Sequence, residues 1–252
     1  MVFRKILRAF GVGGPSVETE LTDPHCRPGG VLEGTVQVTG GDHPVDVEYL
    51  AIGLITRVEV ESGDSEYESG QEFHRQRLTG SFRLVPGRRH EVPFRFEVPW
   101  ETPITEVYGQ RLNGMSMGLT TELEVARAVD KSDLDAVMVH PLPAQERILE
   151  ALLRLGFRFS RADVERGRVY GVEQRLPFYQ EIEFYPPAAY ASTLNELELT
   201  FVPTPERLQV VLEVERRSRH RPEGFGRFDV DYATIDQVDW PAELDGWLRR
   251  AR

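Results

Sequence analysis

The sequence has a single cysteine, no long apolar run and fewer basic than acidic residues. Cys26 has no second thiol to pair with, so an intrachain disulfide and a four-thiolate zinc site are both excluded. No stretch of about 18 or more apolar residues occurs, so the sequence predicts no membrane-spanning helix. The formal net charge of −11 argues against a broad binding surface for nucleic acid or anionic lipid, because such binding depends on neutralising phosphates.

Motifs that carry catalysis are also missing. The sequence has no phosphate-cradling glycine loop, no nucleophile elbow and no dinucleotide-binding fingerprint. None of the six histidines shows the spacing of a zinc motif: His25, His43, His74, His90, His140 and His220. We therefore predict a protein without enzymatic activity, without a metal site and without a cofactor.

What the sequence does have is an alternation of apolar and polar residues, clearest between Leu176 and Pro187. There Phe178 and Ile182 point to one side of an extended chain, and Glu181 and Glu183 point to the other. Similar rows recur along the chain at 17–21, 32–38, 45–61, 78–84, 92–98, 115–125, 197–201, 208–214 and 228–232. This period of two predicts strands with one face on a core, and hence β-sandwich architecture.

Two segments of the first half need separate treatment. The apolar residues of 45–61 change phase along the segment, which predicts a bulge or bend near 49–51. The next segment, ESGDSEYESGQE at 61–72, is rich in acids, serine and glycine, with hardly any apolar residue to bury. We expect it to be a solvated hairpin loop.

The apolar pattern lapses into polar residues at 129–135, which predicts a linker between two domains. We expect an N-terminal β-sandwich at 1–128 and a C-terminal one at 136–252. Helical spacing of apolar residues predicts short helices at 2–10, at 144–155 and after Asp239. The fold class is therefore all-β, with two tandem sandwiches and short N-terminal, internal and C-terminal helices.

Glu181 and Glu183 form the one pair that suggests catalysis. Two carboxylates on one face of a strand can share the acid and base roles of a glycoside hydrolase. A third acid at the next alternate position would strengthen this hypothesis, but that position holds Tyr185. A carbohydrate-binding or glycoside-hydrolysing sandwich therefore stands as the alternative to a solvated polar strand face.

Two surface features suggest contacts with a partner. The run RRSRHR at 216–221 can hold a phosphate or an acidic segment of a partner, or it can be a solvated hairpin tip. The tryptophan-rich C-terminal helix either seals its own sandwich or docks on a partner. The candidate partner-contact residues are Arg216, Arg217, Arg219, Arg221, Trp240 and Trp247.

Several separated stretches together resemble the bacterial sporulation-control family of arrestin-like proteins. They include MVFRKILRAFGVGG at the N-terminus, PFRFEVPWETPIT, DLDAVMVHPLPAQERILEALLRLGFRF, LPFYQEIEFYPP and LNELELTFVPTPERLQVVLEVERR. The resemblance covers essentially the whole chain. It implies two arrestin-like, immunoglobulin-like sandwiches, no catalysis, and a regulatory role in sporulation or in related developmental or stress control through protein contacts.

These observations together predict a cytoplasmic regulatory adaptor. The N-terminus lacks the apolar core and cleavage site of a secretory signal, and the lone cysteine fits a reducing compartment. We expect protein partners, which can include a second copy of the chain, no nucleic acid, and no stable membrane insertion.

Overall fold

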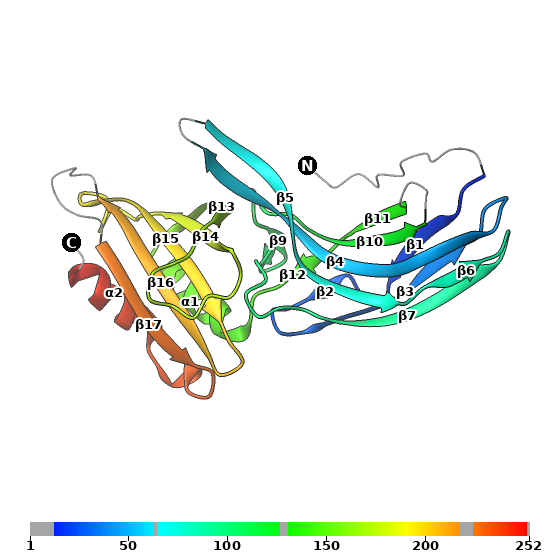
Figure 1. Ribbon diagram of the computed structural model, residues 1–252. Coiled ribbons are helices and arrows are strands. Elements are labelled where there is room, and N and C mark those ends of the chain that lie inside the picture. The colour runs from blue at the N-terminus through cyan, green and yellow to red at the C-terminus, as the bar shows by residue number, and fades with distance from the viewer. Residues whose placement is uncertain (1–12, 63–64, 127–130, 217–223, 251–252) are drawn as a thin grey trace.

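The computed structural model describes residues 13–62, 65–126, 131–216 and 224–250, which form two strand-rich lobes (Figure 1). The all-β prediction is confirmed, because strands dominate both lobes. The predicted helix at 2–10 and the arginines Arg217, Arg219 and Arg221 lie outside the described residues, so the structure says nothing about them.

The N-terminal lobe contains a small antiparallel sheet of order β1–β3–β7. Its strands are β1 (Ser16–Leu21), β3 (Val31–Thr39) and β7 (Arg89–Glu97). Alternate residues such as Val36 and Phe96 are fully buried, while their neighbours along the strand face water. The sequence alternation predicted this arrangement.

A second sheet of this lobe is built around the long strand β4 (Val45–Ser62), which pairs with β10 on one side and with β5 and β6 on the other. These partners are β5 (Ser65–Thr79), β6 (Phe82–Leu84) and β10 (Met117–Val125). The predicted bulge is present, because the register against β5 shifts between Leu50 and Ala51.

The predicted loop at 61–72 is wrong for residues 61–62, which belong to β4, and for residues 65–72, which belong to β5. Composition favoured a loop because this segment contains hardly any apolar residue. The backbone of β4 nevertheless satisfies the hydrogen-bonding groups of β5 along the whole hairpin, so a polar sequence forms a strand here.

The predicted linker also differs from the structure. Lys131–Ala136 forms strand β11, which pairs with β10 and so extends the second sheet of the N-terminal lobe. An edge strand needs backbone partners on one side only and can expose polar side chains, which explains why its sequence looks like a linker. In the two-domain interpretation, β11 therefore belongs to the first domain.

The C-terminal lobe contains five antiparallel strands in the order β13–β14–β15–β16–β17. They are β13 (Arg158–Arg166), β14 (Phe178–Tyr185), β15 (Leu194–Pro203), β16 (Arg207–Arg216) and β17 (Gly224–Asp231). The helical elements are α1 (Pro143–Arg154), the 3-10 helix η1 (Ile235–Gln237) and α2 (Trp240–Arg250). The apolar sides of α1 and α2 join the same buried cluster as the inner face of this sheet. In the described residues, these helices cover the face on which a second sheet was expected.

Two short strand pairs lie between the lobes. Strand β2 (His25–Cys26) pairs in parallel with β12 (Met138–Val139), and β8 (Glu106–Val107) pairs with β9 (Gln110–Arg111). The β2–β12 pair brings together two segments that lie more than 100 residues apart in sequence.

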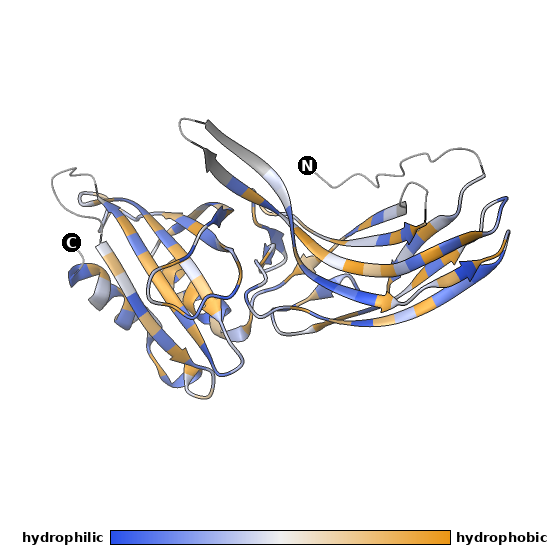
Figure 2. Ribbon diagram, viewed as in Figure 1, coloured by the Kyte–Doolittle hydropathy of each residue, from blue (hydrophilic) through white to orange (hydrophobic). Residues whose placement is uncertain are grey.

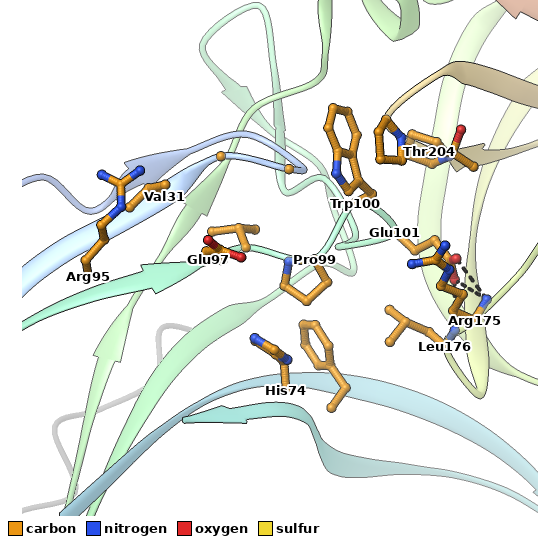
Figure 3. A pocket seen from close by; sticks show the side chains of 16 residues that line it. Val31, His74, Arg95, Glu97, Pro99, Trp100, Glu101, Arg175, Leu176 and Thr204 are labelled. Carbon is orange, nitrogen blue, oxygen red and sulfur yellow. Dashed lines mark hydrogen bonds between the residues drawn. The ribbon is translucent and has the colours of Figure 1, made fainter. Parts of the chain in front are cut away.

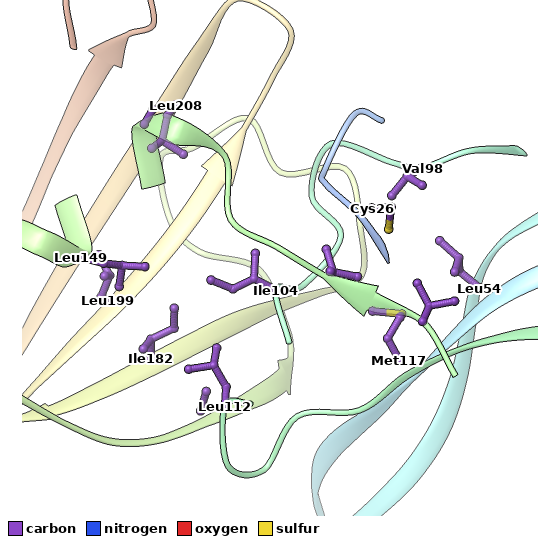
Figure 4. Packing of buried hydrophobic residues seen from close by; sticks show 14 of the residues in the cluster. Cys26, Leu54, Val98, Ile104, Leu112, Met117, Leu149, Ile182, Leu199 and Leu208 are labelled. Carbon is purple, nitrogen blue, oxygen red and sulfur yellow. The ribbon is translucent and has the colours of Figure 1, made fainter. Parts of the chain in front are cut away.

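One buried apolar cluster runs through both lobes (Figure 4). Leu54 of the N-terminal lobe, Ile104 and Leu112 of the junction, and Leu199 of the C-terminal lobe all belong to it. Cys26 packs in the same cluster, and burial raises the pKa of its thiol to about 12. The two lobes therefore share a continuous core.

Hydropathy alternates along most strands of both lobes, as Figure 2 shows. In the described residues, neither α1 nor α2 is long and apolar enough to cross a membrane.

Candidate functional site at the junction of the lobes

A cleft of about 520 Å³ lies between the two lobes, and we name it the interlobe cleft (Figure 3). It is lined by Gly29, Gly30, Val31, Phe73, His74, Arg95, Glu97, Val98, Pro99, Trp100, Glu101, Arg175, Leu176, Pro203, Thr204 and Pro205. These residues come from β3, β5, β7 and the end of β15, and from loops on both sides of the junction. The volume falls in the range of about 300–1,000 Å³ that is usual for ligand-binding clefts.

Aromatic side chains form part of the cleft wall. Trp100 follows β7 and stacks on Tyr232 of the C-terminal lobe, with ring centroids 6.4 Å apart and an interplanar angle of 25°. Its ring lies over Gly29, whose φ of +71° and lack of a Cβ allow this close approach: a Cβ there would come within 2.5 Å of the ring. Phe73 meets Phe178 edge-on at 5.3 Å.

A carboxylate ties the two lobes together beside these rings. Glu101 accepts hydrogen bonds from the backbone amides of Arg175 and Leu176 at 2.8–2.9 Å (Figure 3). Because both amides use this one carboxylate, the loop before β14 is held against the segment that follows β7. The arrangement fixes the backbone that carries the Arg175 side chain.

The cleft also presents positive groups. Arg95 is paired with Glu33 at 3.0 Å, but both side chains are more than half exposed. Such a surface pair contributes little and exchanges readily, so Arg95 is available to another carboxylate. Arg175 is exposed at the opposite side of the cleft. Tryptophan and arginine are the residue types most enriched in protein-binding hot spots, and both line this cleft.

The sequence alone does not identify the interlobe cleft. The alternating row at 92–98 stops just before Pro99-Trp100, and no motif marks Phe73, Glu101 or Arg175. These residues lie far apart in sequence, and only the packing of the lobes brings them together. The one signal available was a tryptophan beside a proline at the end of an alternating strand.

The alternative catalytic pair, Glu181 and Glu183, lies on the outer face of the C-terminal sheet. Glu183 is buried and accepts a hydrogen bond from Arg161 Nε at 2.8 Å. In the strand ladder Glu183 lies opposite Glu198, and Glu181 lies opposite Asp163. Neither glutamate lines the interlobe cleft.

The acidic neighbours change the behaviour of the Glu181 carboxyl. Burial, followed by repulsion from Glu198 and Asp163, raises the pKa of Glu181 from its ordinary value to about 8. Burial and the nearby Glu183 carboxylate raise the pKa of Glu196 to about 7. This outer face is therefore an acidic surface that carries fewer negative charges at neutral pH than its sequence suggests.

The predicted partner-contact tryptophans pack largely on their own lobe. Trp240 stacks on Phe228 with centroids 5.7 Å apart, and its Nε1 donates to the Ile235 carbonyl at 2.8 Å. The Trp247 ring lies directly over Gly226 of β17. Both remain partly exposed and line a shallow groove beside α2. Their role in partner contact stays a prediction.

The predicted basic cluster is only partly described. The backbone of Arg216 ends strand β16, and Arg217, Arg219 and Arg221 lie outside the described residues. The proposal that this run binds an acidic partner is therefore untouched by the structure.

Comparison with known proteins gives consistent matches. A model of the SpoOM protein family matches residues 3–218. The sporulation-control protein spo0M of Bacillus subtilis (strain 168) is 37% identical over 218 residues, which is 86% of this chain and 81% of that protein. The crystal structure of Spo0M, sporulation control protein, from Bacillus subtilis matches with a TM-score of 0.84 and 31% identity, over 96% of this chain and 100% of that chain. The matches extend over both lobes.

Proposed function

The chain belongs to the SpoOM protein family, and from this premise we propose that it is a non-catalytic regulatory adaptor in sporulation control or a related developmental or stress response. The similarity to a protein named for sporulation control supports the regulatory part. The interlobe cleft is the observation that supports action through protein contacts, because it combines an aromatic wall with exposed arginines at the junction of the lobes.

The chemistry of the cleft defines the partner that it fits. Trp100 and Phe73 offer an apolar surface for an aromatic or aliphatic anchor. Arg95 and Arg175 offer guanidinium groups for a carboxylate. The Glu101 carboxylate is already engaged by backbone amides, which lessens its repulsion of an acidic ligand. The occupant is therefore an extended segment of a partner protein that carries an apolar anchor and an acidic residue.

A crosslinking experiment tests this proposal in cells. A photoreactive amino acid replaces Arg95 or Arg175 in the cleft, and mass spectrometry identifies the crosslinked segment. The same substitution at Arg88, an exposed arginine of the turn before β7, serves as the control. We expect crosslinks from the cleft positions to a segment with an apolar anchor and a carboxylate, and no such crosslink from position 88.

Binding of that segment to the purified protein provides the quantitative test. We expect Arg175→Gln and Arg95→Gln to weaken binding by about tenfold each, because each removes a charge-assisted hydrogen bond. Arg88→Gln makes the same change in net charge away from the cleft and should leave the affinity unchanged. Equal effects of all three variants, or none, would contradict the proposal.

The alternative of a glycoside-hydrolysing sandwich has its own test. The parent protein and a Glu181→Gln variant are assayed side by side on a panel of glycans. Hydrolysis by the parent that disappears in the variant would overturn the adaptor proposal.

A further inference from the structure

Two histidines and a glutamate from three separate segments meet at the junction of the lobes. His25 lies in β2, Glu106 in β8, and His140 directly follows β12. Nδ1 of His25 and Nε2 of His140 are 2.7 Å apart, and the two rings are stacked with an interplanar angle of 14°. One ring nitrogen of each histidine and one Glu106 carboxylate oxygen all lie within 4.8 Å of one another.

Backbone hydrogen bonds fix the three segments that carry these side chains. The His140 amide donates to the Cys26 carbonyl at 2.8 Å, which ties the residue after β12 to β2. The Thr105 amide donates to the Val139 carbonyl at 2.8 Å, and the Val139 amide donates to Thr105 Oγ1 at 2.9 Å. His140 therefore makes one of these backbone links itself. His25 and Glu106 each lie next to a residue that makes one. The site is held together before any ligand binds.

We propose that His25, His140 and Glu106 form a binding site for a divalent transition metal ion, of which Zn²⁺ is the best match. Two imidazoles and a carboxylate are the donor set that zinc accepts, whereas Ca²⁺ and Mg²⁺ require mostly oxygen ligands. His25 is exposed and His140 and Glu106 are partly exposed, so water can complete the coordination. This inference does not depend on the proposed adaptor function.

The two histidines require only a small adjustment for the metal. Tetrahedral zinc with Zn–N bonds of about 2.0–2.1 Å places two ligating nitrogens about 3.3 Å apart. The His25 and His140 nitrogens are already 2.7 Å apart around a shared proton. A metal ion would replace that proton after a side-chain movement of roughly half an ångström, and the exposed His25 ring can make this movement.

The glutamate is oriented for the same role by its neighbours. Its Oε1 lies 3.8 Å from Arg111 Nε, and its Oε2 lies 4.0 Å from Nδ1 of His140. The Glu106 carboxylate therefore lies beside the His140 ring, and a rotation of its side chain would bring an oxygen to a metal held by the two histidines. A metal held here would join β2 of the N-terminal half to the segment that leads into α1, and so would reinforce the junction of the lobes.

Metal titration of tag-free, chelator-treated protein tests the proposal. Isothermal titration with ZnCl₂ should give one strong site per chain, and thermal unfolding should shift to higher temperature in the presence of Zn²⁺. His25→Ala, His140→Ala and Glu106→Gln should each weaken binding by about tenfold or more and abolish the thermal shift. His43→Ala removes an exposed histidine outside the cluster and should change neither quantity.

Cobalt gives a second readout that reports on the ligands themselves. Co²⁺ bound by two imidazoles and a carboxylate should produce visible absorption bands that are lost in His25→Ala, a substitution at an exposed side chain that leaves the fold intact. Absence of a one-to-one site, or equal binding by the His25→Ala and parent proteins, would overturn the proposal. In either case the histidine pair would be only a hydrogen-bonded link between strands.

Discussion

The Glu181 carboxyl is surrounded by like charges and should make stability depend on pH. Its pKa of about 8 in the folded protein lies above its ordinary value of 4.5. The folded state therefore binds this proton more tightly than the unfolded state. The free energy of unfolding should fall as pH rises from about 4.5 to about 8, because the unfolded chain releases this proton while burial and the nearby Glu198 and Asp163 make the folded chain retain it.

We expect Glu181→Gln to remove most of this slope. The variant should be more stable than the parent by about 2 kcal/mol at pH 8.5 and nearly equal to it at pH 4.5, as measured by urea unfolding across the pH range. Glu20→Gln, an exposed glutamate on β1, should leave the pH dependence unchanged. If the free energy of unfolding depended on pH in the same way in the Glu181→Gln and parent proteins, the repulsion at Glu181 would be relieved in another way.

Single residues also show where sequence reasoning reaches its limit. The alternation around β14 correctly assigned Phe178 and Ile182 to the core and Glu181 to the opposite face. The same reasoning found no partner for His25, because the ring nitrogen nearest to it belongs to His140, 115 residues away. Periodicity determines which way a side chain points from its strand. It carries no information on which distant segment lies beside it.

Among the secondary-structure elements, the alternating strands were predictable and the polar ones were not. Strands β3, β7, β10, β15 and β16 follow apolar rows that the sequence displays. The outer part of β5 and strand β11 lack such rows, and they form because β4 and β10 provide backbone partners. Pairing of this kind depends on the neighbouring strand, so the local sequence favours a loop or linker at the same residues.

Helix α2 provides a test of whether its tryptophan serves the lobe itself. Trp247 lies over Gly226 of β17, where a Cβ would come within about 2.1 Å of the indole ring. We expect Gly226→Ala to displace Trp247 and to lower the free energy of unfolding by about 1–3 kcal/mol. Urea unfolding followed by tryptophan fluorescence measures both the loss and the altered environment of the ring.

A second glycine supplies the matched control for this change. Gly246 lies inside α2, and a Cβ there would approach only the flexible end of Arg250, at 3.5 Å. Gly246→Ala should therefore raise the free energy of unfolding by about 0.5–1 kcal/mol, through helix propensity alone. If Gly226→Ala did not lower the free energy of unfolding either, α2 would not be docked through Trp247, and the surface of this tryptophan would be free for a partner.

At the scale of the whole molecule, hydrogen bonds and one strand bridge between the lobes supplement the shared apolar core. Glu101 holds the amides of Arg175 and Leu176, and β4 and β13 meet in a parallel bridge at Glu59 and Glu165. A small second cluster contains Val58 of β4 with Val164 and Phe178 of the C-terminal sheet. Contacts of this kind keep the walls of the interlobe cleft in fixed positions, as a preorganised binding site requires.

Gln180 makes the most deeply buried of these links. Its Oε1 accepts from the Ile104 amide at 3.0 Å, and its Nε2 donates to the Ile104 carbonyl at 2.8 Å. Gln180→Ala would leave both backbone groups buried without partners. We expect it to lower the free energy of unfolding by about 3 kcal/mol and to speed amide hydrogen exchange at Ile104.

Gln209 distinguishes loosening of the junction from general destabilisation. It is equally buried, and it accepts from the Glu173 amide and donates to Asp229 within the C-terminal lobe. Gln209→Ala should therefore lower the free energy of unfolding. The amide of Ile104 should not exchange faster relative to the other amides of the N-terminal half. Because Gln180, unlike Gln209, bonds across the junction of the lobes, faster exchange at Ile104 should appear in Gln180→Ala and not in Gln209→Ala. The same exchange profile in both variants would mean that the Gln180 amide does not contribute to holding the lobes together.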